Sequence, residues 1–530
     1  MENTVINNIA ILDCTLRDGG YINEWNFKKN SICSIIKYLE EAQIDIIECG
    51  FLKDEPYDPD RAIFNDVEQI EKLIYPKSPN TMYVAMIALG DIDPEKIAPY
   101  NGKSIDGIRV TFHKNDWEEN EKAVKTLINK GYKVFVQPVG TTSYSDFEIV
   151  ELIEKVNKLN PFAFYLVDTL GIMYQKDLLR LFYIVENNLN KGIRIGFHSH
   201  NNLQLSFSNA QELLKLNTKR DIIIDSSVFG MGRGAGNLAT ELITKYINDN
   251  IKFKYKVTPL LSIVDEYLNP IYSRTPWGYS APYYLAAIGG CHPNYATYLM
   301  NKQTINVEAI SKILNHIPED KRSLYDEKCV ENLYLEYQNN QVDDSEALQK
   351  LGSMLGSRNI LIMGPGHTLI SHRDKITKYI KDNNPIVITV NFLSDLYHHD
   401  YVFVSNKKRM KMITETISNN GTVIVTSNIN SVPEGCLQVN YSGLIGEGRE
   451  ADNAGAMLLR LLSRIGIKRA SLAGFDGFSA GAQPNYYSND MDRLLDRQAA
   501  MQKNEDIRLQ LLQVSTKIDI DFITPTSYNL

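Results

Sequence analysis

The sequence predicts an α/β fold: a (β/α)8 TIM barrel, followed by a small helical domain and a C-terminal Rossmann-like α/β domain. Short apolar runs alternate eight times with helical patterns between Ile9 and about Asn248, which is the length and rhythm of such a barrel. Side chains able to bind a metal follow the first and the seventh run. All strands of a barrel open onto one C-terminal mouth, so these two strand ends would meet there. An open doubly wound sheet, the alternative, would make them neighbours only by accident.

Composition bounds the class of protein. The 530 residues predict two or three domains. A hydrophobic content of 43% and a charged content of 23% are typical of globular proteins, and the net charge of −8 argues against a nucleic-acid or anionic-membrane surface. No apolar run has membrane-spanning length, and Met1 to Ala10 does not resemble a signal peptide. Six scattered cysteines without a CxxC pair predict reduced thiols and a cytoplasmic protein.

Eight apolar runs are predicted to be the barrel strands. They are Ile9–Leu16, Ile44–Cys49, Met82–Ile87, Gly107–Phe112, Lys133–Pro138, Phe162–Val167, Ile193–Phe197 and Ile222–Ser226. The helical patterns between them include Ser31–Ala42, Glu119–Lys130, Asp146–Lys158 and Leu178–Asn187. This alternation is what the barrel requires.

The segment Gly196–Asn202 follows the seventh run and carries two histidines. Side chains two apart on a strand point to one face, so His198 and His200 can present imidazoles to one point. An isolated pair of this kind is more often two unrelated loop histidines. Asp18, which follows the first run, adds a carboxylate, and neutral imidazole and carboxylate are common metal ligands. The three residues together predict an open metal site with room for a substrate.

Four motifs in a fixed order carry a family resemblance. They are Thr15–Gly19, Glu48–Phe51, His198–Asn201, and Gly232–Asn237 with Thr240–Glu241. Together they resemble the DRE-TIM metallolyase superfamily, which includes 4-hydroxy-2-oxovalerate aldolase, hydroxymethylglutaryl-CoA lyase and isopropylmalate synthase. The resemblance covers residues 9 to about 250, and Gly107–His113 is most similar to the hydroxy-oxovalerate aldolase branch. That branch has a histidine three residues after the metal aspartate as its proposed base, where this sequence has Tyr21.

The resemblance implies a divalent-metal-dependent aldolase that makes or cleaves a carbon–carbon bond between a pyruvate enolate and an aldehyde. Asp18, His198 and His200 would hold the ion, with Mn²⁺ first and Mg²⁺, Co²⁺ or Zn²⁺ as alternatives. Asn237 would be a fourth ligand, as in some family members. Arg17 would meet the enolate oxygen or the substrate carboxylate as a charge-assisted donor. A purely structural ion pair between Arg17 and Glu48 is the alternative.

The base that handles the hydroxyl proton of the aldol is left open. The candidates are Tyr21, His113 at the end of the fourth run, and a metal-bound water. Gly230–Asn237 can present backbone amides to an anion such as the substrate carboxylate. The expected substrate contacts are Glu48, Thr169, Gly232 and Arg233.

Residues 251–345 are predicted to form a small helical domain that completes the active site. Trp277–Tyr283 lies in a crowd of aromatic residues, which usually serve packing. The segment also resembles the helical domain of the aldolase, which lends a tyrosine to the active site, and Tyr283 is assigned that role. Asn339–Ser345 is polar and acidic, as expected of a linker.

Residues 351–530 are predicted to form the Rossmann-like domain. Asn359–Leu369 has the pattern strand, glycine turn, helix, and we expect the turn to leave free amides for a phosphate. Asn453–Gly455 and Ala473–Phe478 resemble bacterial sialyltransferases and relatives with pterin diphosphokinase activity. The residues expected to bind a nucleotide or nucleotide sugar are Gly364, Gly366, Asn453, Gly455 and Asp476. No histidine follows Phe478 to act as a sialyltransferase base, so a binding or degenerate domain is equally consistent.

Two other functions stay open. One is a Claisen-type acyl-CoA/2-oxo acid synthase or acyl-CoA lyase, which acetyl-CoA-dependent turnover would reveal. The other is a scaffold or glycosyltransferase-like protein with a retired barrel, which would not bind metal. An aldolase joined to a sialyltransferase-like module suggests surface-polysaccharide precursor metabolism, by analogy only. The expected partners are a 2-oxo acid, an aldehyde and a nucleotide or nucleotide sugar, in a homo-oligomer without nucleic acid or a membrane span.

Overall fold

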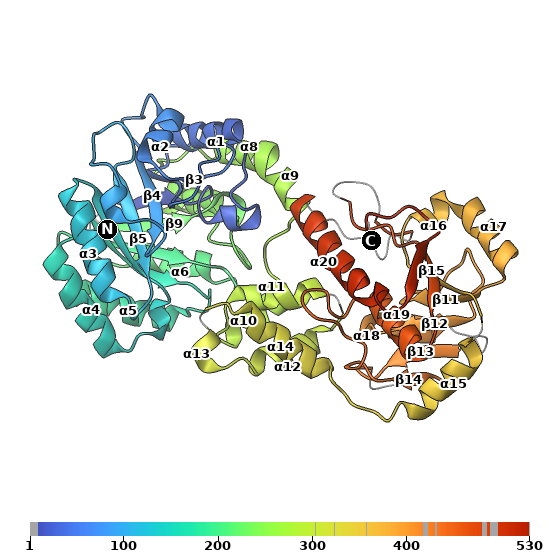
Figure 1. Cartoon of the computed structure of the whole chain (residues 1–530). Helices are drawn as coiled ribbons and strands as arrows, with labels where there is room; N and C mark the ends of the chain where they lie inside the picture. Colours follow the sequence, from blue (N-terminus) through green and yellow to red (C-terminus); the bar gives the residue numbers. More distant parts are fainter. Residues whose placement is uncertain are drawn as a thin grey trace. The chain divides into compact units, whose positions relative to one another are not determined.

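Eight parallel strands close the first half of the chain into a barrel (Figure 1). Around the ring they follow the order β1, β9, β8, β7, β6, β5, β4 and β2, and β2 pairs back onto β1. Their bounds are β1 Ile9–Asp13, β2 Ile46–Leu52, β4 Met82–Ala88, β5 Gly107–Phe112, β6 Lys133–Pro138, β7 Ala163–Asp168, β8 Arg194–Ser199 and β9 Ile222–Ser226. The predicted (β/α)8 barrel is confirmed. A two-residue strand beside β2, β3 (Ile63–Phe64), was not predicted.

This computed structural model describes residues 9–302, 304–322, 324–356, 358–416, 422–429, 432–479, 485–487, 497–528 and 530. The chain forms two compact units. The first comprises the chain up to Thr297 with Pro318–Tyr325, and the second comprises Tyr298–Ile317 with Asp326–Leu530. The division falls inside residues 251–345, the segment predicted as one helical domain, so the three-domain division stays a prediction.

The first unit has helices around its barrel, among them α3, α4, α5 and α6, and further helices after it (Figure 1). Their bounds are α1 Lys29–Glu41, α2 Val67–Ile74, α3 Trp117–Asn129, α4 Asp146–Leu159, α5 Gln175–Asn188, α6 Ser206–Lys215, α7 Thr240–Asn250, α8 Val257–Ile263, α9 Asn269–Tyr272, α10 Ala281–Ile288 and α13 Glu319–Arg322, with α11 Pro293–Lys302 crossing the division. In α1 the buried side chains Ile32, Ile35, Ile36 and Leu39 recur at the spacing of one helical face. Such apolar faces cover the barrel.

The barrel strands are covered on both sides. All residues of β2 and β7 are buried, as expected for parallel strands with helices outside and a filled interior. Leu12, Val84 and Phe135 are among the side chains that fill the ring from within. The interior is therefore a packed core, and chemistry is confined to the ends of the strands.

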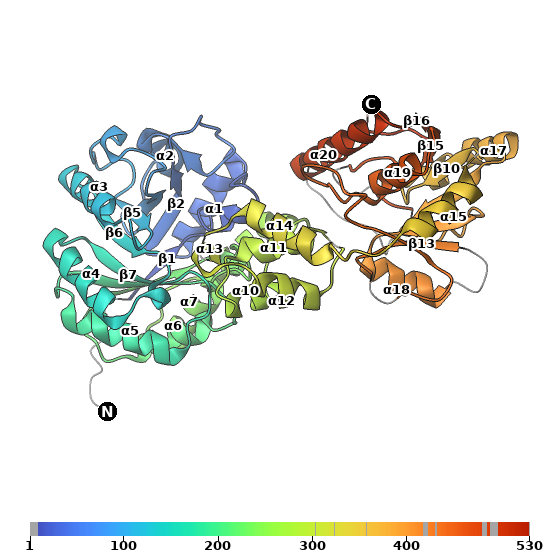
Figure 2. The ribbon, with the colours of Figure 1, turned by 60° about the horizontal axis from the view of Figure 1, so that its bottom comes forward.

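A seven-stranded parallel sheet forms the centre of the second unit (Figure 2). The strand order is β14-β13-β12-β11-β10-β15-β16, so the order changes direction at β10. The strands are β10 Ile360–Met363, β11 Ile386–Val390, β12 Tyr401–Val404, β13 Thr422–Thr426, β14 Leu437–Val439, β15 Arg469–Ala473 and β16 Asp519–Phe522. The helices are α12 Val307–Asn315, α14 Glu327–Gln338, α15 Ser345–Leu355, α16 Thr368–Ser371, α17 Arg373–Asn383, α18 Lys407–Thr416, α19 Ala454–Arg464 and α20 Arg497–Ser515.

Helices cover both faces of this sheet. Alternate residues of β10 show it: Ile360 and Ile362 pack in a cluster with residues of α15, α19 and α20, whereas Leu361 and Met363 pack with residues of α16 and α17. A further α/β unit after the barrel is therefore confirmed. Among the described residues, no helix has the length and apolarity needed to cross a membrane.

Candidate metal centre

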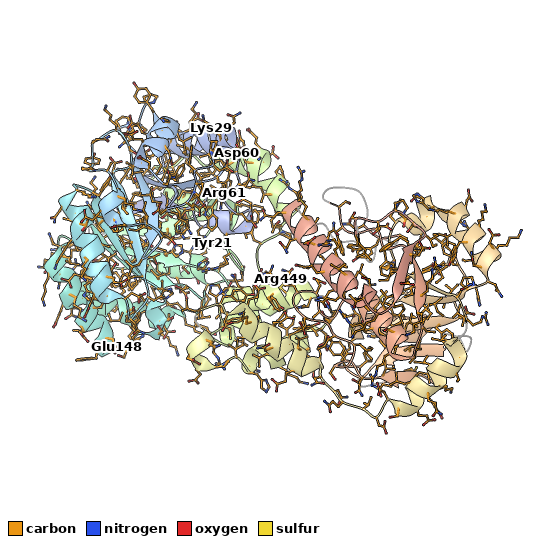
Figure 3. The ribbon with its side chains drawn as sticks, in the orientation of Figure 1. Tyr21, Lys29, Asp60, Arg61, Glu148 and Arg449 are labelled. Carbon is orange, nitrogen blue, oxygen red and sulfur yellow. The ribbon has the colours of Figure 1, made fainter. Side chains whose placement is uncertain are left out.

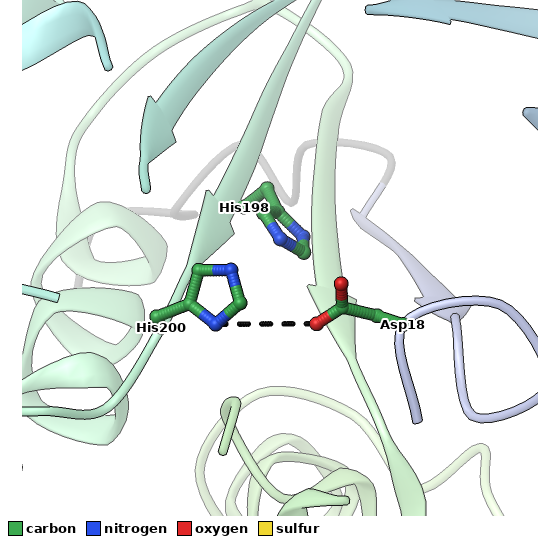
Figure 4. A group of neighbouring side chains, drawn as sticks. All are labelled: Asp18, His198 and His200. Carbon is green, nitrogen blue, oxygen red and sulfur yellow. Dashed lines mark ion pairs between the residues drawn. The ribbon is translucent and has the colours of Figure 1, made fainter. Parts of the chain in front are cut away.

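Asp18, His198 and His200 converge at the mouth of the barrel (Figure 4). β8 carries His198, His200 follows directly after that strand, and Asp18 lies in the turn after β1. All three are buried, and one potential ligand atom from each lies within 4.8 Å of the other two. His200 Nδ1 is 3.9 Å from Asp18 Oδ2. The sequence-predicted ligands are thus brought together.

The ionisation of these side chains suits a cation. Burial opposes the charge of Asp18, but the charges of Arg17, His200, His198 and Arg233 outweigh it and hold the pKa of the carboxyl well below its usual range. Burial lowers the pKa of His200 to about 3, with Asp18 opposing and nearby cations reinforcing the shift. At neutral pH the pair therefore offers a carboxylate and a neutral imidazole, which are the forms that bind metal.

Asn237 supplies a further test of whether the residues fit a metal. Its Nδ2 donates to Asp18 Oδ2 at 2.5 Å, while its buried Oδ1 has no hydrogen-bond partner among the described residues. A Cβ on Gly232 would lie only 2.5 Å from Asn237 Nδ2 and 3.1 Å from Asp18 Oδ2, so glycine keeps this space open. Carboxylate, imidazole and amide oxygen are suitable donors for a divalent ion, and the group could hold one.

A set of buried charged residues, Asp225, Arg109 and Glu48, lies next to His198 inside the barrel. His198 Nδ1 lies 3.0 Å from Asp225 Oδ2, and Tyr165 donates its hydroxyl to Asp225 Oδ1 at 3.1 Å. Arg109 is fully buried, binds Asp225, and lies 2.7 Å from Glu48 Oε2. Burial works against the charge of Asp225, but Arg109 and His198 hold the pKa of its carboxyl below the usual range.

Sequence reasoning missed Asp225 and Tyr165. Asp225 could have been found because it is a carboxylate inside the apolar run Ile222–Ser226, and a buried charge needs a partner. With its Nδ1 held by Asp225, His198 presents Nε2 to the centre.

Arg17 joins this set of charged residues to Asp18. Its Nε donates to Glu48 Oε2 at 2.8 Å and its Nη1 to Asp18 Oδ1 at 2.7 Å. The third nitrogen, Nη2, is buried without a partner among the described residues. Arg17 can therefore form the structural ion pair with Glu48 through Nε and still have an N–H donor on Nη2 for a ligand.

The remaining barrel candidates lie around this centre in different ways. Tyr21, labelled in Figure 3, lies on the short turn after Asp18 and is 40% exposed, with the guanidinium of Arg233 4.8 Å from its ring centroid. His113 follows β5 and is exposed. Thr169 Oγ1 accepts from Gly140 N at 2.9 Å. Tyr283, on α10, pairs its hydroxyl with Thr297 Oγ1 at 3.1 Å rather than with a residue of the metal centre.

The glycine loops of the second unit are brought together at the ends of β10 and β15. Gly364 N donates to Ala473 O at 2.8 Å and Gly366 N to Gly474 O at 2.9 Å. Asp476 accepts from Thr368 N at 2.7 Å, which places a carboxylate at the start of the short helix α16. The expectation that this turn leaves free amides is wrong for Gly364, Gly366 and Thr368.

The two other predicted residues of this unit have local roles. Asn453 caps α19 by accepting from Ala456 N at 3.1 Å. A Cβ on Gly455 would collide with the ring of Phe475, so the glycine permits close packing. Nucleotide binding at these loops stays a prediction.

Comparison with known proteins gives matches to the barrel segment. Residues 8–265 match the family model described as HMGL-like. The 4-hydroxy-2-oxovalerate aldolase of Pseudoalteromonas translucida is 25% identical over 245 residues, 45% of this chain and 70% of that protein. The oxaloacetate decarboxylase of Mycobacterium tuberculosis is 24% identical over 243 residues, 44% of this chain and 68% of that protein. The match to the HMGL-like family confirms the resemblance of the barrel segment.

One solved structure is the N-terminal domain of a protein described as an aldolase, from Bacteroides vulgatus. It is 24% identical, with a TM-score of 0.49, and the alignment covers 57% of this chain and 99% of that one. The likeness of the second unit to sialyltransferases stays a prediction.

Proposed function

We propose that this chain, whose residues 8–265 match the HMGL-like family, is a divalent-metal-dependent lyase acting on 2-oxo acids. More specifically, the protein would be an aldolase that joins a pyruvate enolate to an aldehyde or cleaves the product. The names of the relatives support it, since 4-hydroxy-2-oxovalerate and oxaloacetate are both 2-oxo acids. The observation that carries the proposal is the buried group of Asp18, His198 and His200, beside an arginine with an unpartnered donor.

Each residue has a task in the proposed reaction. A divalent ion held by Asp18, His198 and His200, with the amide oxygen of Asn237, would polarise the carbonyl of the 2-oxo acid as a Lewis acid. Arg17 donates Nη2–H to the oxygen on which negative charge develops, and Glu48 fixes the orientation of the guanidinium. Tyr21, on the turn that follows Asp18, is proposed as the acceptor of the hydroxyl proton in cleavage, with His113 as the alternative.

The second unit is proposed to bind a nucleotide or nucleotide sugar. Its strand order reverses at β10, and open parallel sheets bind ligands where the order reverses. Gly364, Gly366 and Asp476 lie at the carboxyl ends of the two strands concerned, β10 and β15. A role in surface-polysaccharide precursor synthesis, a cytoplasmic location, homo-oligomer formation and the preference for Mn²⁺ stay parts of this proposal.

Proton exchange on pyruvate tests the barrel chemistry without knowledge of the aldehyde. Protein loaded with Mn²⁺ and incubated with pyruvate in D₂O should exchange the methyl protons, because an enolate forms and is reprotonated; the quenched, demetallated mixture is read by NMR. His198→Ala should abolish exchange while the protein stays folded, whereas His398→Ala, at an exposed position in the second unit, should exchange like the wild type. Exchange at an equal rate in His198→Ala and the wild type would reject the metal centre. Turnover that requires acetyl-CoA would replace the aldolase with a Claisen-type synthase.

A further inference from the structure

His292 lies within reach of the charge of His200, one of the three candidate metal ligands, and the sequence motifs do not include it. It directly precedes Pro293, the first residue of α11, and belongs to the first unit. Pro293 packs on the loop that carries Arg233, since a Cβ on Gly234 would lie 3.3 Å from Pro293 Cβ. His292 is thus next to a residue that contacts the Arg233 loop.

The Arg233 loop is in turn fastened to the end of β8. Asn201 N donates to Gly236 O at 2.8 Å, and Ala235 N donates to Asn202 Oδ1 at 2.9 Å. The segment after His200, the loop with Arg233, and the start of α11 are therefore packed in succession. Through Pro293, this succession connects His292 to the loops that follow β8 and β9.

The surroundings keep the His292 imidazole neutral. Burial and then the charges of Arg233, His200 and His113 lower its pKa to about 3. These three side chains come from the Arg233 loop, the end of β8 and the end of β5. His292 therefore lies within electrostatic reach of three different strand ends.

A hydrogen bond fixes which nitrogen carries the proton. His292 Nδ1 accepts from Asn294 N at 3.2 Å, so the proton of the neutral ring is on Nε2. The backbone N–H of His292 donates to Arg322 O at 2.7 Å, which anchors the residue. Among the described residues none accepts a hydrogen bond from Nε2, so this N–H is available to a ligand.

We propose that His292 is a catalytic residue that donates Nε2–H to the carbonyl oxygen of the aldehyde acceptor; this inference rests on the proposed aldolase function. The base first takes a methyl proton from pyruvate. The enolate carbon then bonds to the aldehyde carbon, and the π pair of the aldehyde moves to its oxygen. Nε2–H stabilises that alkoxide until the proton held by the base returns to it, so atoms and charge balance. A neutral imidazole suits this task because its N–H donates without prior ionisation.

The inference predicts that His292 matters for one half of the reaction only. Exchange of pyruvate methyl protons in D₂O reports enolate formation, and condensation of pyruvate with acetaldehyde or propionaldehyde reports the use of the acceptor. In full-length protein loaded with Mn²⁺, His292→Ala should lower the condensation rate roughly 100-fold, as loss of one alkoxide donor does. Exchange should stay within about threefold of the wild type, and His292→Gln, which keeps an N–H donor, should recover about a tenth of the condensation rate.

The controls separate this inference from the proposed function. His398→Ala is the matched variant, and melting curves establish that each protein is folded. Equal losses in both reactions, or no loss in either, would overturn the role of His292. A wild-type protein that exchanges methyl protons but condenses neither aldehyde would overturn it too, while the pyruvate chemistry would stand. Absence of exchange in the wild type would reject the proposed function and this inference together.

Discussion

Asp225 holds the ring of His198, one of the three candidate metal ligands. Its carboxylate lies 3.0 Å from His198 Nδ1 and is itself held by Arg109 and Tyr165. Such partners fix the tautomer and ring angle of a ligating imidazole and raise its basicity. A neutral amide of the same shape in place of the carboxylate would no longer raise the basicity of the imidazole.

Asp225→Asn should therefore weaken Mn²⁺ binding about 10- to 100-fold, measured by titration calorimetry or competition with a chelator. Asp221→Asn is the matched control, because Asp221 directly precedes the same strand and its partly exposed carboxylate pairs with Arg194 at 3.2 Å, away from His198. An unchanged dissociation constant in Asp225→Asn would remove the orienting role.

His292 should also contribute to the pH dependence of the free energy of unfolding. The pKa of this imidazole falls from 6.5 in an unfolded chain to about 3 in the folded one. Its contribution to stability is therefore fully present above pH 6.5 and is lost as the pH falls toward 3. Between pH 7.5 and pH 5 the loss attributable to His292 is about 2 kcal/mol.

His292→Gln should remove that part of the slope. In metal-free protein, urea unfolding at the two pH values should show that the variant loses about 2 kcal/mol less than the wild type. His398→Gln should lose as much as the wild type. Parallel losses in all three proteins would mean that His292 titrates normally in the folded state.

The convergence of Asp18, His198 and His200 was predictable from the sequence, and the buried residues that surround them were not. Asp18, His198 and His200 follow strand ends, and the common mouth of a barrel brings such ends together. Asp225 and Arg109 lie 116 residues apart, and only closure of the ring makes them partners. His292 is tied to the Arg233 loop because Pro293 packs on Gly234, a contact that no local sequence pattern encodes.

At the scale of elements, the backbones of the loops after β10 and β15 lie so close to each other that only glycine fits between them. Gly474 has φ +72°, and a Cβ there would collide with the carbonyl oxygen of Gly364. Gly466, after α19, has φ +92°, but a Cβ at that position would have no atom within 4 Å. The two positions share the unusual backbone angle and differ in crowding.

Gly466→Ala should cost about 1–2 kcal/mol, the penalty of a positive φ alone. Gly474→Ala should cost more than twice as much, because the two loops must also separate. Urea denaturation of the second unit measures both losses. Equal losses would show that the loops tolerate separation, and the close approach would then have no energetic weight.

The eight barrel strands were predicted because parallel strands covered on both faces appear as continuous apolar runs. The boundary between the units was not predictable in this way. Tyr334 of α14 donates its hydroxyl to Asp452 at 2.5 Å across 118 residues of sequence, and such contacts assign α14 to the sheet unit. A helical pattern alone does not reveal which core a helix joins.

At the scale of the whole molecule, the two units have separate hydrophobic cores. A ligand stabilises only the unit that binds it, and Mn²⁺ at about 100 times its dissociation constant should add roughly 2.7 kcal/mol to the barrel. The barrel unit comprises Met1–Thr297 and Pro318–Tyr325, and at about 2.1 cal/mol/K of unfolding entropy per residue this stabilisation corresponds to a rise of roughly 4 °C in one melting transition.

Calorimetry should show one transition moved by Mn²⁺ and the other unmoved. His198→Ala should abolish the shift, and Gly474→Ala should lower the transition that Mn²⁺ leaves in place. A metal-induced shift of both transitions by the same amount would mean that the units unfold together.

The alternating charges beneath the metal centre also constrain how this sequence can diverge. Arg17, Glu48, Arg109 and Asp225 are buried in a row, each neutralised by its neighbours. Removing one charge leaves another uncompensated, at a cost of about 3–5 kcal/mol, whereas exchanging a whole pair for apolar side chains can be neutral. Mutational scans that change one position at a time will therefore score all four residues as indispensable. Such scans will miss double substitutions that replace both members of an ion pair. The fitness effects of these positions are therefore epistatic, and libraries that vary the barrel mouth should hold the four charges constant.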